Sequence, residues 1–356
     1  MNKYFSFYAV VAFSACLLVG CEKDKTEIPD CGIRFTVNSG NTFNICETPT
    51  RVTLYNNATD FENSGASFAV FGNNEDYSEE LFKEKIVTKE GDYYKPSVDY
   101  DWDGTYINVY AVAPYNSGTC PSTISNPEVK VVINPYDGTE KYMMTFHYQA
   151  LSSGIKVDPS TLKDIMVGYN QNSHISSGFS KTIGINFYHV LSGVKFIAGN
   201  SLAGVTVKSI SLVDFEAVGD YIVKINDSGI EEIKCSFSLL EGTSTYTNRY
   251  IYENNFGDGE TINNAGDEIG NTILIPHQTL FTSIPPYYPR IRVVTTKGGI
   301  DKVYSNIFPN TSKYSPINFD ASKIYNITID IDDYKYTRSS STDGSLRLSV
   351  TSTPMD

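Results

Sequence analysis

Three aspartates at alternate positions give one stretch of this sequence the beginning of a cation-binding motif. They lie in Asp99-x-Asp101-x-Asp103-Gly104, and alternating carboxylates of this kind can converge on a hard cation such as Ca²⁺. The twelfth position of the motif is Tyr110, where an EF-hand requires a glutamate. An EF-hand is therefore excluded, and two interpretations stay open: a looser calcium site, or an acidic turn around Trp102.

The histidines lack the spacing of a metal site. His147, His174, His189 and His277 are scattered along the chain, and no two of them are separated as zinc ligands are. His189 follows Phe187 in an apolar stretch, which favours a core or interface imidazole. The sequence contains no nucleophile elbow, phosphate-binding loop or dinucleotide fingerprint, and spacing cannot reveal a glycosidase carboxylate pair. We predict a protein that is not an enzyme and holds no metal or cofactor.

Four cysteines follow the N-terminal segment and could form disulfides in an oxidising compartment: Cys31, Cys46, Cys120 and Cys235. Cys31 with Cys46 is the favoured local pair, because closing a loop of about fifteen residues would contribute about 3 kcal/mol. Free thiols are equally compatible with the sequence. No C-x-x-C spacing occurs, which argues against zinc binding and thioredoxin-type chemistry.

The first twenty residues have the features of an export signal. Lys3 supplies a positive charge, Tyr4 to Val19 form an apolar run, and Leu18-Val19-Gly20 precede Cys21 in the pattern of a lipoprotein cleavage site. The apolar run is shorter than the roughly 20 residues of a permanent membrane helix. We expect residues 1–20 to be removed as a signal peptide and Cys21 to carry acyl chains such as palmitate. An ordinary secretory signal is the alternative.

The residues after Cys21 predict a flexible tether over 21–30. The stretch from Glu22 to Glu27 is charged and should be solvated, and it resembles the acidic signals that send lipoproteins to the outer face of the outer membrane. A periplasmic orientation is the alternative. The whole chain carries 28 basic and 41 acidic residues, a net charge of −13. Because such a charge repels phosphate backbones, we expect no nucleic-acid partner.

From residue 31 onward, apolar residues recur at every second position, the spacing of a β-strand with one buried face. Ile33 to Val37 show this alternation in the first half, residues 31–178, and Tyr106 to Val112 form an almost continuous apolar run typical of a doubly buried strand. The alternation returns over residues 179–337 and ends with Tyr325 to Ile331. Many short strands with almost no helix predict an all-β protein of two antiparallel β-sandwich domains.

Three segments depart from the strand pattern. Asp158-Pro159 has the residues of a helix start, with Asp158 as the cap and Leu162 to Ile165 facing inward. Asn170 to Gly178 is rich in serine, glycine and asparagine, and we interpret it as the connection between the domains. Residues 253–271 combine glycines with acidic residues and predict a long mobile loop.

The order of these segments resembles the fimbrillin family, the major, minor and accessory subunits of type V pili. The matching segments of the first half are Ile33-x-Phe35, Thr50-Arg51, Ser67 to Gly72 and Asn108 to Tyr115. Those of the second half are Ile165 to Gly168, Phe187 to Phe196, Leu274 to Gln278 and Tyr325 to Ile329. The resemblance covers nearly the whole chain after the signal peptide.

The resemblance implies two tandem transthyretin-like antiparallel β-sandwich domains, exported as a lipoprotein to the cell outer membrane and assembled into a fimbrium by strand exchange. In such pilins a protease cuts after an arginine, the first strand is lost, and the groove accepts a strand from the next subunit. Arg51 stands where that cut would fall, whereas Arg34 lies inside the strand from Ile33 to Val37. Other pilus subunits, of the same or another kind, would be the partners. Stalk, tip and anchor roles stay open.

The donor strand would lie in the C-terminal tail, residues 338–356. Leu346, Leu348 and Val350 alternate there as in a short strand. A tail rich in serine and threonine is more often a frayed terminus, and Arg51 could be an ordinary surface residue, so both alternatives stay open.

The alternative function is a glycan-binding surface lipoprotein that serves nutrient capture. Exposed rings such as Tyr93, Tyr94, Tyr287 and Tyr288 could stack on sugars, although tyrosines beside prolines more often close a loop. Such a protein would use an aromatic platform instead of an exchanged strand. For an adhesive subunit, a host glycan or a host protein would be the ligand.

Overall fold

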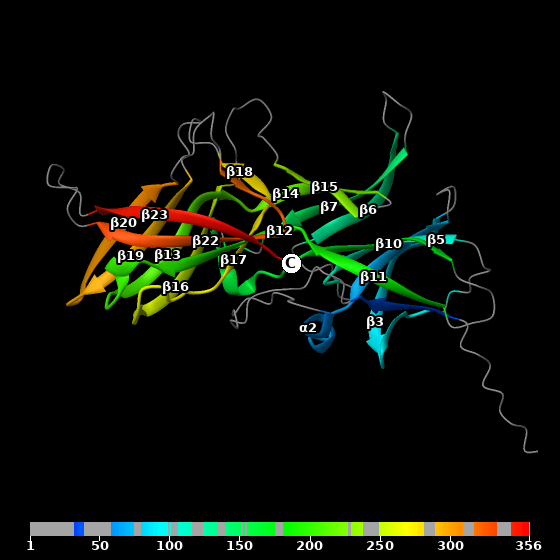
Figure 1. Ribbon diagram of the computed structural model, residues 1–356, viewed down its shortest axis with the longest axis horizontal. Helices are drawn as coiled ribbons and strands as arrows, with labels where there is room; N and C mark the ends of the chain where they lie inside the picture. Colours follow the sequence, from blue (N-terminus) through cyan, green and yellow to red (C-terminus); the bar gives the residue numbers. More distant parts are fainter. Residues whose placement is uncertain are drawn as a thin grey trace, which may run out of the picture.

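A computed structural model describes residues 32–38, 58–74, 80–98, 100, 106–115, 124–133, 140–150, 152–153, 155–174, 181–226, 229–237, 249–280, 289–308, 317–332 and 343–355. Figure 1 shows an elongated molecule with a β-barrel at one end and a larger β-structure at the other. Strands make up nearly all of its secondary structure, which confirms the predicted all-β class. None of the helices in these ranges has the length and hydrophobicity of a membrane-spanning segment.

Seven strands close into a barrel in the order β1-β11-β10-β5-β2-β3-β4. Their bounds are β1 (Ile33–Val37), β2 (Phe68–Asn74), β3 (Glu80–Glu90), β4 (Tyr93–Pro96), β5 (Tyr106–Ala113), β10 (Met166–His174) and β11 (Lys181–His189). The short helix α2 (Ala58–Asn63) places the buried side chain of Phe61 in the barrel core. A closed barrel leaves no free sheet edge, and in this respect it differs from the open sandwich that the resemblance implies.

The barrel strands follow the apolar pattern of the sequence. β1 buries Ile33, Phe35 and Val37, as the alternation predicts. β5 is buried at every position after Tyr106. One of its faces lies in the barrel core and the other packs against the second half of the molecule, so the predicted doubly buried strand is confirmed.

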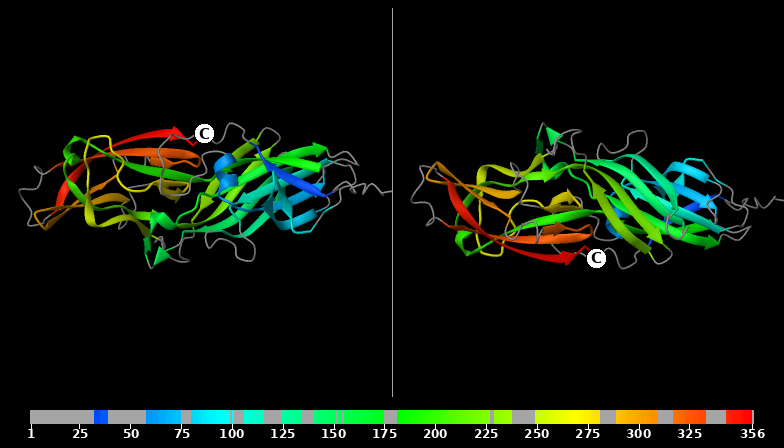
Figure 2. Two further views of the ribbon diagram at one scale, coloured as in Figure 1. Left: turned by 90° about the horizontal axis from the view of Figure 1, so that it is seen from below. Right: turned by 90° about the horizontal axis from the view of Figure 1, so that it is seen from above.

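The second half is built on a ten-stranded sheet in the order β17-β12-β22-β23-β20-β19-β13-β16-β9-β8. The bounds are β8 (Ser152–Ser153), β9 (Lys156–Val157), β12 (Leu191–Ala198), β13 (Thr206–Glu216), β16 (Arg249–Thr261), β17 (Ile273–Pro276), β19 (Arg290–Lys297), β20 (Ile300–Ile307), β22 (Lys323–Asp332) and β23 (Asp343–Pro354). β20 and β23 pair only at Val303 with Asp343 and at Tyr304 with Gly344 in the described part of the chain. This contact joins two parts of the sheet, β17-β12-β22-β23 and β20-β19-β13-β16-β9-β8. The two parts enclose a common core (Figure 2).

Two smaller sheets complete the fold. They are β15-β14-β7-β6, with β6 (Ile124–Ile133), β7 (Glu140–Gln149), β14 (Val218–Asn226) and β15 (Gly229–Ser236), and β18-β21, with β18 (Gln278–Leu280) and β21 (Ile317–Phe319). β7 precedes the barrel strand β10 and pairs with β14 of the second half. Phe71 and Tyr110 of the barrel also belong to the same core cluster as Phe196 of β12. The two halves therefore share a sheet and a core.

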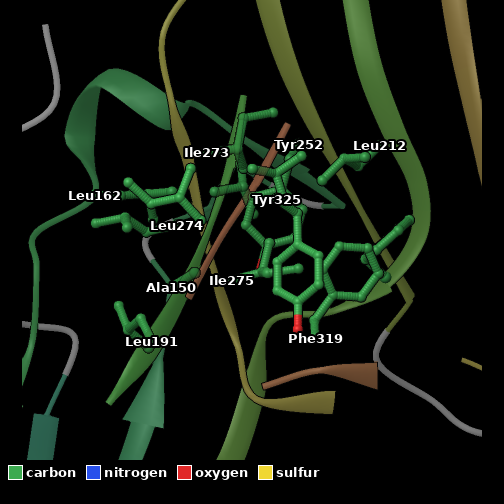
Figure 3. Close-up of a cluster of buried hydrophobic side chains, with 14 of the residues drawn as sticks. Ala150, Leu162, Leu191, Leu212, Tyr252, Ile273, Leu274, Ile275, Phe319 and Tyr325 are labelled. Carbon is green, nitrogen blue, oxygen red and sulfur yellow. The ribbon is translucent and has the colours of Figure 1, made fainter. Parts of the chain in front are cut away.

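The core at the junction lies beneath β12 and β17. Figure 3 shows Ile275 beside the rings of Phe319 and Tyr325, with Leu191 and Ile273 in the same cluster. The centroids of these two rings are 4.7 Å apart. Burial of each large apolar side chain stabilises the fold by about 1.5–3 kcal/mol, so this cluster fixes β22 and β12 to one another.

The stretch from Asn170 to Gly178 does not separate two domains. Its first five residues, 170–174, belong to β10, and β10 pairs antiparallel with β11, for example Met166 with His189. The chain leaves the barrel only after β11, at Val190. Polar turn residues have the same composition in a hairpin and in a domain connection, which is why the composition misplaced the boundary.

The predicted helix start at Asp158 is confirmed, although only one turn forms. η1 (Pro159–Thr161) is a 3₁₀ helix, and the Asp158 carboxylate accepts a hydrogen bond from the backbone N–H of Ser160 at 2.9 Å. Leu162 and Ile165 are buried as expected. A second 3₁₀ turn, η2 (Asn200–Leu202), follows β12.

The predicted mobile loop over residues 253–271 is wrong. β16 continues to Thr261 and stays paired with β13 through a bulge, in which Gly257 and Gly259 adopt positive φ angles of 61° and 112°. Beyond the strand, the backbone N–H of Ile269 donates to the carbonyl of Phe196 at 2.8 Å. The glycines therefore mark a bulge in a paired strand.

A buried Asp–His pair lies where the chain enters and leaves the barrel. Asp164 comes before β10, His189 ends β11, and His189 Nδ1 is 2.6 Å from Asp164 Oδ2. Their side chains are 0 % and 2 % exposed, which confirms the predicted core imidazole. The backbone N–H of Val190 also donates to the carbonyl of Ile165 at 3.0 Å. These contacts join the two chain segments that cross the junction.

We expect Asp164→Leu and His189→Leu each to lower the free energy of unfolding by about 3–5 kcal/mol, because each leaves a buried polar partner behind. The double variant should lose clearly less than the sum of the two single losses. Urea unfolding followed by circular dichroism measures all three. Fully additive losses would show that the two side chains do not depend on one another.

Candidate functional site

The candidate site is the seam at which β1 closes the barrel. Every residue of β1 pairs with the parallel strand β11. On the other side, the described pairing between β1 and β4 consists of Phe35 with Tyr94. The backbone N–H of Ile33 adds a hydrogen bond to the carbonyl of Tyr100, 3.2 Å away. β1 is thus held by one full ladder and by sparse contacts on its second edge.

Phe35 fills the centre of the seam. Its side chain is 1 % exposed, and its ring makes edge contacts with Phe68 at 6.4 Å and with Phe82 at 6.3 Å between centroids. Further aromatic rings in the same cluster are Phe61, Tyr94 and Phe187. If β1 were absent, an apolar slot with aromatic walls would face water along the unpaired edge of β11.

Side chains reinforce the seam on its outer side. The Arg34 guanidinium lies 5.1 Å from the centroid of the Tyr93 ring in β4. A cation–π contact of this kind contributes about 0.5–1 kcal/mol where water has access. At the end of β1, the Asn38 amide donates to the side-chain carbonyl of Asn186 at 3.0 Å. The outer face of β1 therefore has contacts to both neighbouring strands.

β23 is the second component of the site. It pairs antiparallel with β22 from Ser345 to Pro354, and Leu346 is 2 % exposed. After the strand ends, Met355 is 1 % exposed, and its backbone N–H donates to the carbonyl of Ser322 at 2.7 Å. Figure 1 places the C-terminus between the two halves of the molecule. Asp343–Pro354 of the predicted tail thus form a strand of the chain's own sheet, with Leu346 buried near its start and Met355 buried just after its end.

β1 and β23 carry the same residue pattern. The segments Ile33-Arg34-Phe35-Thr36-Val37 and Leu346-Arg347-Leu348-Ser349-Val350 both read apolar, arginine, apolar, hydroxyl, valine. In both strands the first apolar residue is buried, and the apolar positions share one face. This five-residue similarity is also a structural one, because both segments are paired strands.

Several predicted site residues lie outside the described residues: Cys21, Cys31, Cys46, Arg51, Cys120, Asp99, Asp101, Asp103, Tyr287 and Tyr288. Leu346, Leu348 and Val350 all lie in β23. Of the tyrosines considered for sugar stacking, Tyr94 is 1 % exposed in the barrel core, and Tyr93 is half-buried beneath Arg34. Tyr94 is therefore closed to a sugar, and the Arg34 guanidinium occupies one face of the Tyr93 ring.

Several titratable groups of the described ranges are buried. No His, Cys, Asp and Glu side chains gather there with the geometry of a metal site. Burial raises the pKa of the Cys235 thiol, which therefore stays protonated at neutral pH and is a poor nucleophile. Burial also raises the pKa of Tyr148 and of Tyr221 in the shared sheet. On the surface of that sheet, His147 Nδ1 lies 2.8 Å from Asp220 Oδ1.

No protein-family model matches the sequence, and no curated protein matches it. Among solved structures, a candidate cell adhesion protein from Bacteroides uniformis is 11% identical with a TM-score of 0.46, over 92% of this chain and 99% of that chain. Another from Bacteroides ovatus is 11% identical with a TM-score of 0.48, over 90% and 95%. A C-terminally truncated tip fimbrial protein from Porphyromonas gingivalis is 7% identical with a TM-score of 0.39, over 81% and 94%.

We expect Phe35→Ala to lower the free energy of unfolding by about 3–5 kcal/mol, because it removes the ring that fills the seam. Thr36→Ala, a neighbouring change at a half-buried position, should stay within about 0.5 kcal/mol of the parent chain. Urea unfolding gives both values. Equal losses for the two variants would mean that the seam does not depend on the Phe35 ring.

Proposed function

We propose that the chain is a cell-surface lipoprotein of fimbrillin type, a structural or adhesive subunit of a pilus that assembles by strand exchange. Its two modules would be variants of the transthyretin-like sandwich, and its partners would be other subunits of the same or another kind. Cys21 would hold the precursor on the outer membrane, and an adhesive subunit would also bind a host glycan or protein. The protein would work by binding and assembly, without catalysis.

The match between β1 and the segment from Leu346 to Val350 carries this proposal. A donor strand must present apolar side chains at the spacing of the strand that it replaces. The donor would place Leu346, Leu348 and Val350 where β1 has Ile33, Phe35 and Val37. Arg347 would take the place of Arg34 over the ring of Tyr93. Leucine is smaller than phenylalanine, so the walls of the slot would have to close slightly around Leu348.

The order of residues along the chain supports a role for Arg51. β1 lies between Cys21 and Arg51, so one cut after Arg51 separates both the lipid anchor and β1 from the rest of the chain. The loss of β1 would leave the five positions of β11 that it pairs without partners. Unpaired backbone groups beside an apolar slot form a receptor for an added strand. A single proteolytic event would thus release the subunit and activate it.

The glycan-binding alternative finds less support in the described residues. Large exposed hydrophobic side chains there are Val98, Tyr106, Ile155, Ile300 and Ile307. Tyr106 is the one aromatic residue among them, and a stacking platform for an extended sugar chain needs several rings on one face. The seam and its matching strand are therefore the better candidate site.

We expect an arginine-specific protease to cut the chain after Arg51 and to produce a ladder of oligomers on mild electrophoresis. Release of β1 opens the slot, and β23 of another copy fills it. Arg51→Ala should remain uncut and monomeric under the protease conditions. N-terminal sequencing of the product identifies the cut.

The donor variants separate strand exchange from nonspecific association. Leu348→Asp should be cut normally but fail to polymerise, because it places a charge in the apolar slot. Ser349→Asp, on the exposed face of the same strand, should be cut and polymerise as the parent chain does. A parent chain that loses β1 and stays monomeric would disprove the proposed function.

A further inference from the structure

Among the described residues, β23 has one fully paired edge and one edge that is open along most of its length. Along β22 its ladder is continuous from Ser345 to Pro354. On the other side, the pairs with β20 end at Gly344, and the Asn306 amide donates a hydrogen bond to the carbonyl of Leu346 at 2.6 Å. From Arg347 to Thr353, no strand in the described part of the chain pairs with this side. Figure 2 shows β23 along the border of the molecule in both views.

Three strands at the ends of sheets carry features that discourage pairing, and β23 lacks these features along its open edge. β6 contains Pro127 within an irregular register, β15 carries the charges of Glu231, Glu232 and Lys234, and β8 has only two residues. Prolines, bulges, charges and short length all protect an edge. Between Leu346 and Thr353, β23 has one charged residue, Arg347, and no proline. Its open edge is therefore competent to accept another strand.

The side chains along the open edge are also incompletely covered. Leu348 and Val350 point to the core side of the sheet, yet both are only half-buried. Their partners on β22, Ile329 and Ile327, are 0 % exposed. Leu348 and Val350 thus lie beside backbone groups that no strand of the described residues pairs, and one added strand would cover both.

We propose that a second copy of this chain supplies that strand, so that two β23 edges join antiparallel about a two-fold axis at Val350. Val350 is the middle residue of the open stretch from Arg347 to Thr353. This register places Arg347 opposite Thr353 of the other copy, so like charges do not meet. Leu348 and Val350 of both copies come together on one face of the joined sheet. The contact is isologous, since the same surface serves both partners.

The pairing uses the outer edge of β23 while the strand stays in its own sheet. It needs no cut at Arg51 and no donated strand, so it does not rest on the proposed function. Each copy carries a net charge of −13, which opposes association at long range. Screening by salt should therefore strengthen the dimer.

Analytical ultracentrifugation of the uncut chain, without protease, tests the dimer. We expect a monomer–dimer equilibrium that shifts toward dimer as salt rises. In the proposed register Ser349 faces Thr351 of the other copy. The double variant Ser349→Lys/Thr351→Lys should therefore weaken dimerisation at least tenfold, because it sets two lysines directly opposite one another on each side of the two-fold axis.

The matched control for this double variant is Thr328→Lys. Thr328 lies on β22, opposite Ser349 in the ladder and away from the open edge, so this variant should dimerise as the parent chain does. A loss of dimer in this control equal to the loss in the double variant would mean that added positive charge, and not its place on the open edge, causes the effect, which would count against the proposal.

A cysteine scan tests the register. Val350→Cys lies opposite itself across the two-fold axis and should form a disulfide-linked dimer on mild oxidation, since directly paired strand residues fit disulfide geometry. Thr353→Cys faces Arg347 and should not link beyond the level of the parent chain. Circular dichroism confirms that each variant is folded. A parent chain that stays monomeric at all salt concentrations, or a dimer that the two lysines do not weaken, would overturn the proposal.

Discussion

The need to pair the backbone of β11 and to bury the Phe35 ring governs the rest of this structure. A barrel closes only when its last edge finds a partner, and β1 provides that partner along its whole length. The ring of Phe35 fills the space between Phe68 and Phe82 at the same place. One strand of five residues thus satisfies the backbone groups of β11 and completes the aromatic core. Its loss would leave unpaired backbone groups and an uncovered apolar slot together, and in the proposed assembly another strand would fill both.

The two halves of the molecule are coupled where the chain passes between them. β7 and β14 form one sheet across the junction, and the Asp164–His189 pair joins the segments that enter and leave the barrel. The carbonyl of Ser322, which follows β21, accepts the backbone N–H of Met355. The C-terminal strand therefore ends close to the junction. In the proposed assembly, β23 is the donated strand and the barrel is the module that receives one. The end of β23 would thus lie close to the barrel of its own chain.

Patterns that are local in sequence predicted the local structure well. The alternation from Ile33 to Val37 gave β1, and Asp158 gave the cap of η1, because each depends on residues a few positions apart. Strand partners are set by contacts between distant residues, so neither the closed barrel nor the sheet shared by β7 and β14 was visible. Gly257 and Gly259 predict a loop and a bulge equally well, and only the pairing of β16 with β13 decides between them. The similarity of β1 to β23 was readable from the sequence and was missed.

The central claim is that the slot of β1 accepts the segment of β23. Hydrogen exchange of β11, measured after a cut at Arg51 and removal of the released N-terminal segment, tests it most directly. The amides of β11 that pair with β1 should then exchange rapidly, and a synthetic peptide of residues 343–354 should restore their protection. A cut barrel whose β11 amides remain unprotected at saturating peptide, or are protected to the same extent by a peptide with aspartate in place of Leu348, would contradict the account.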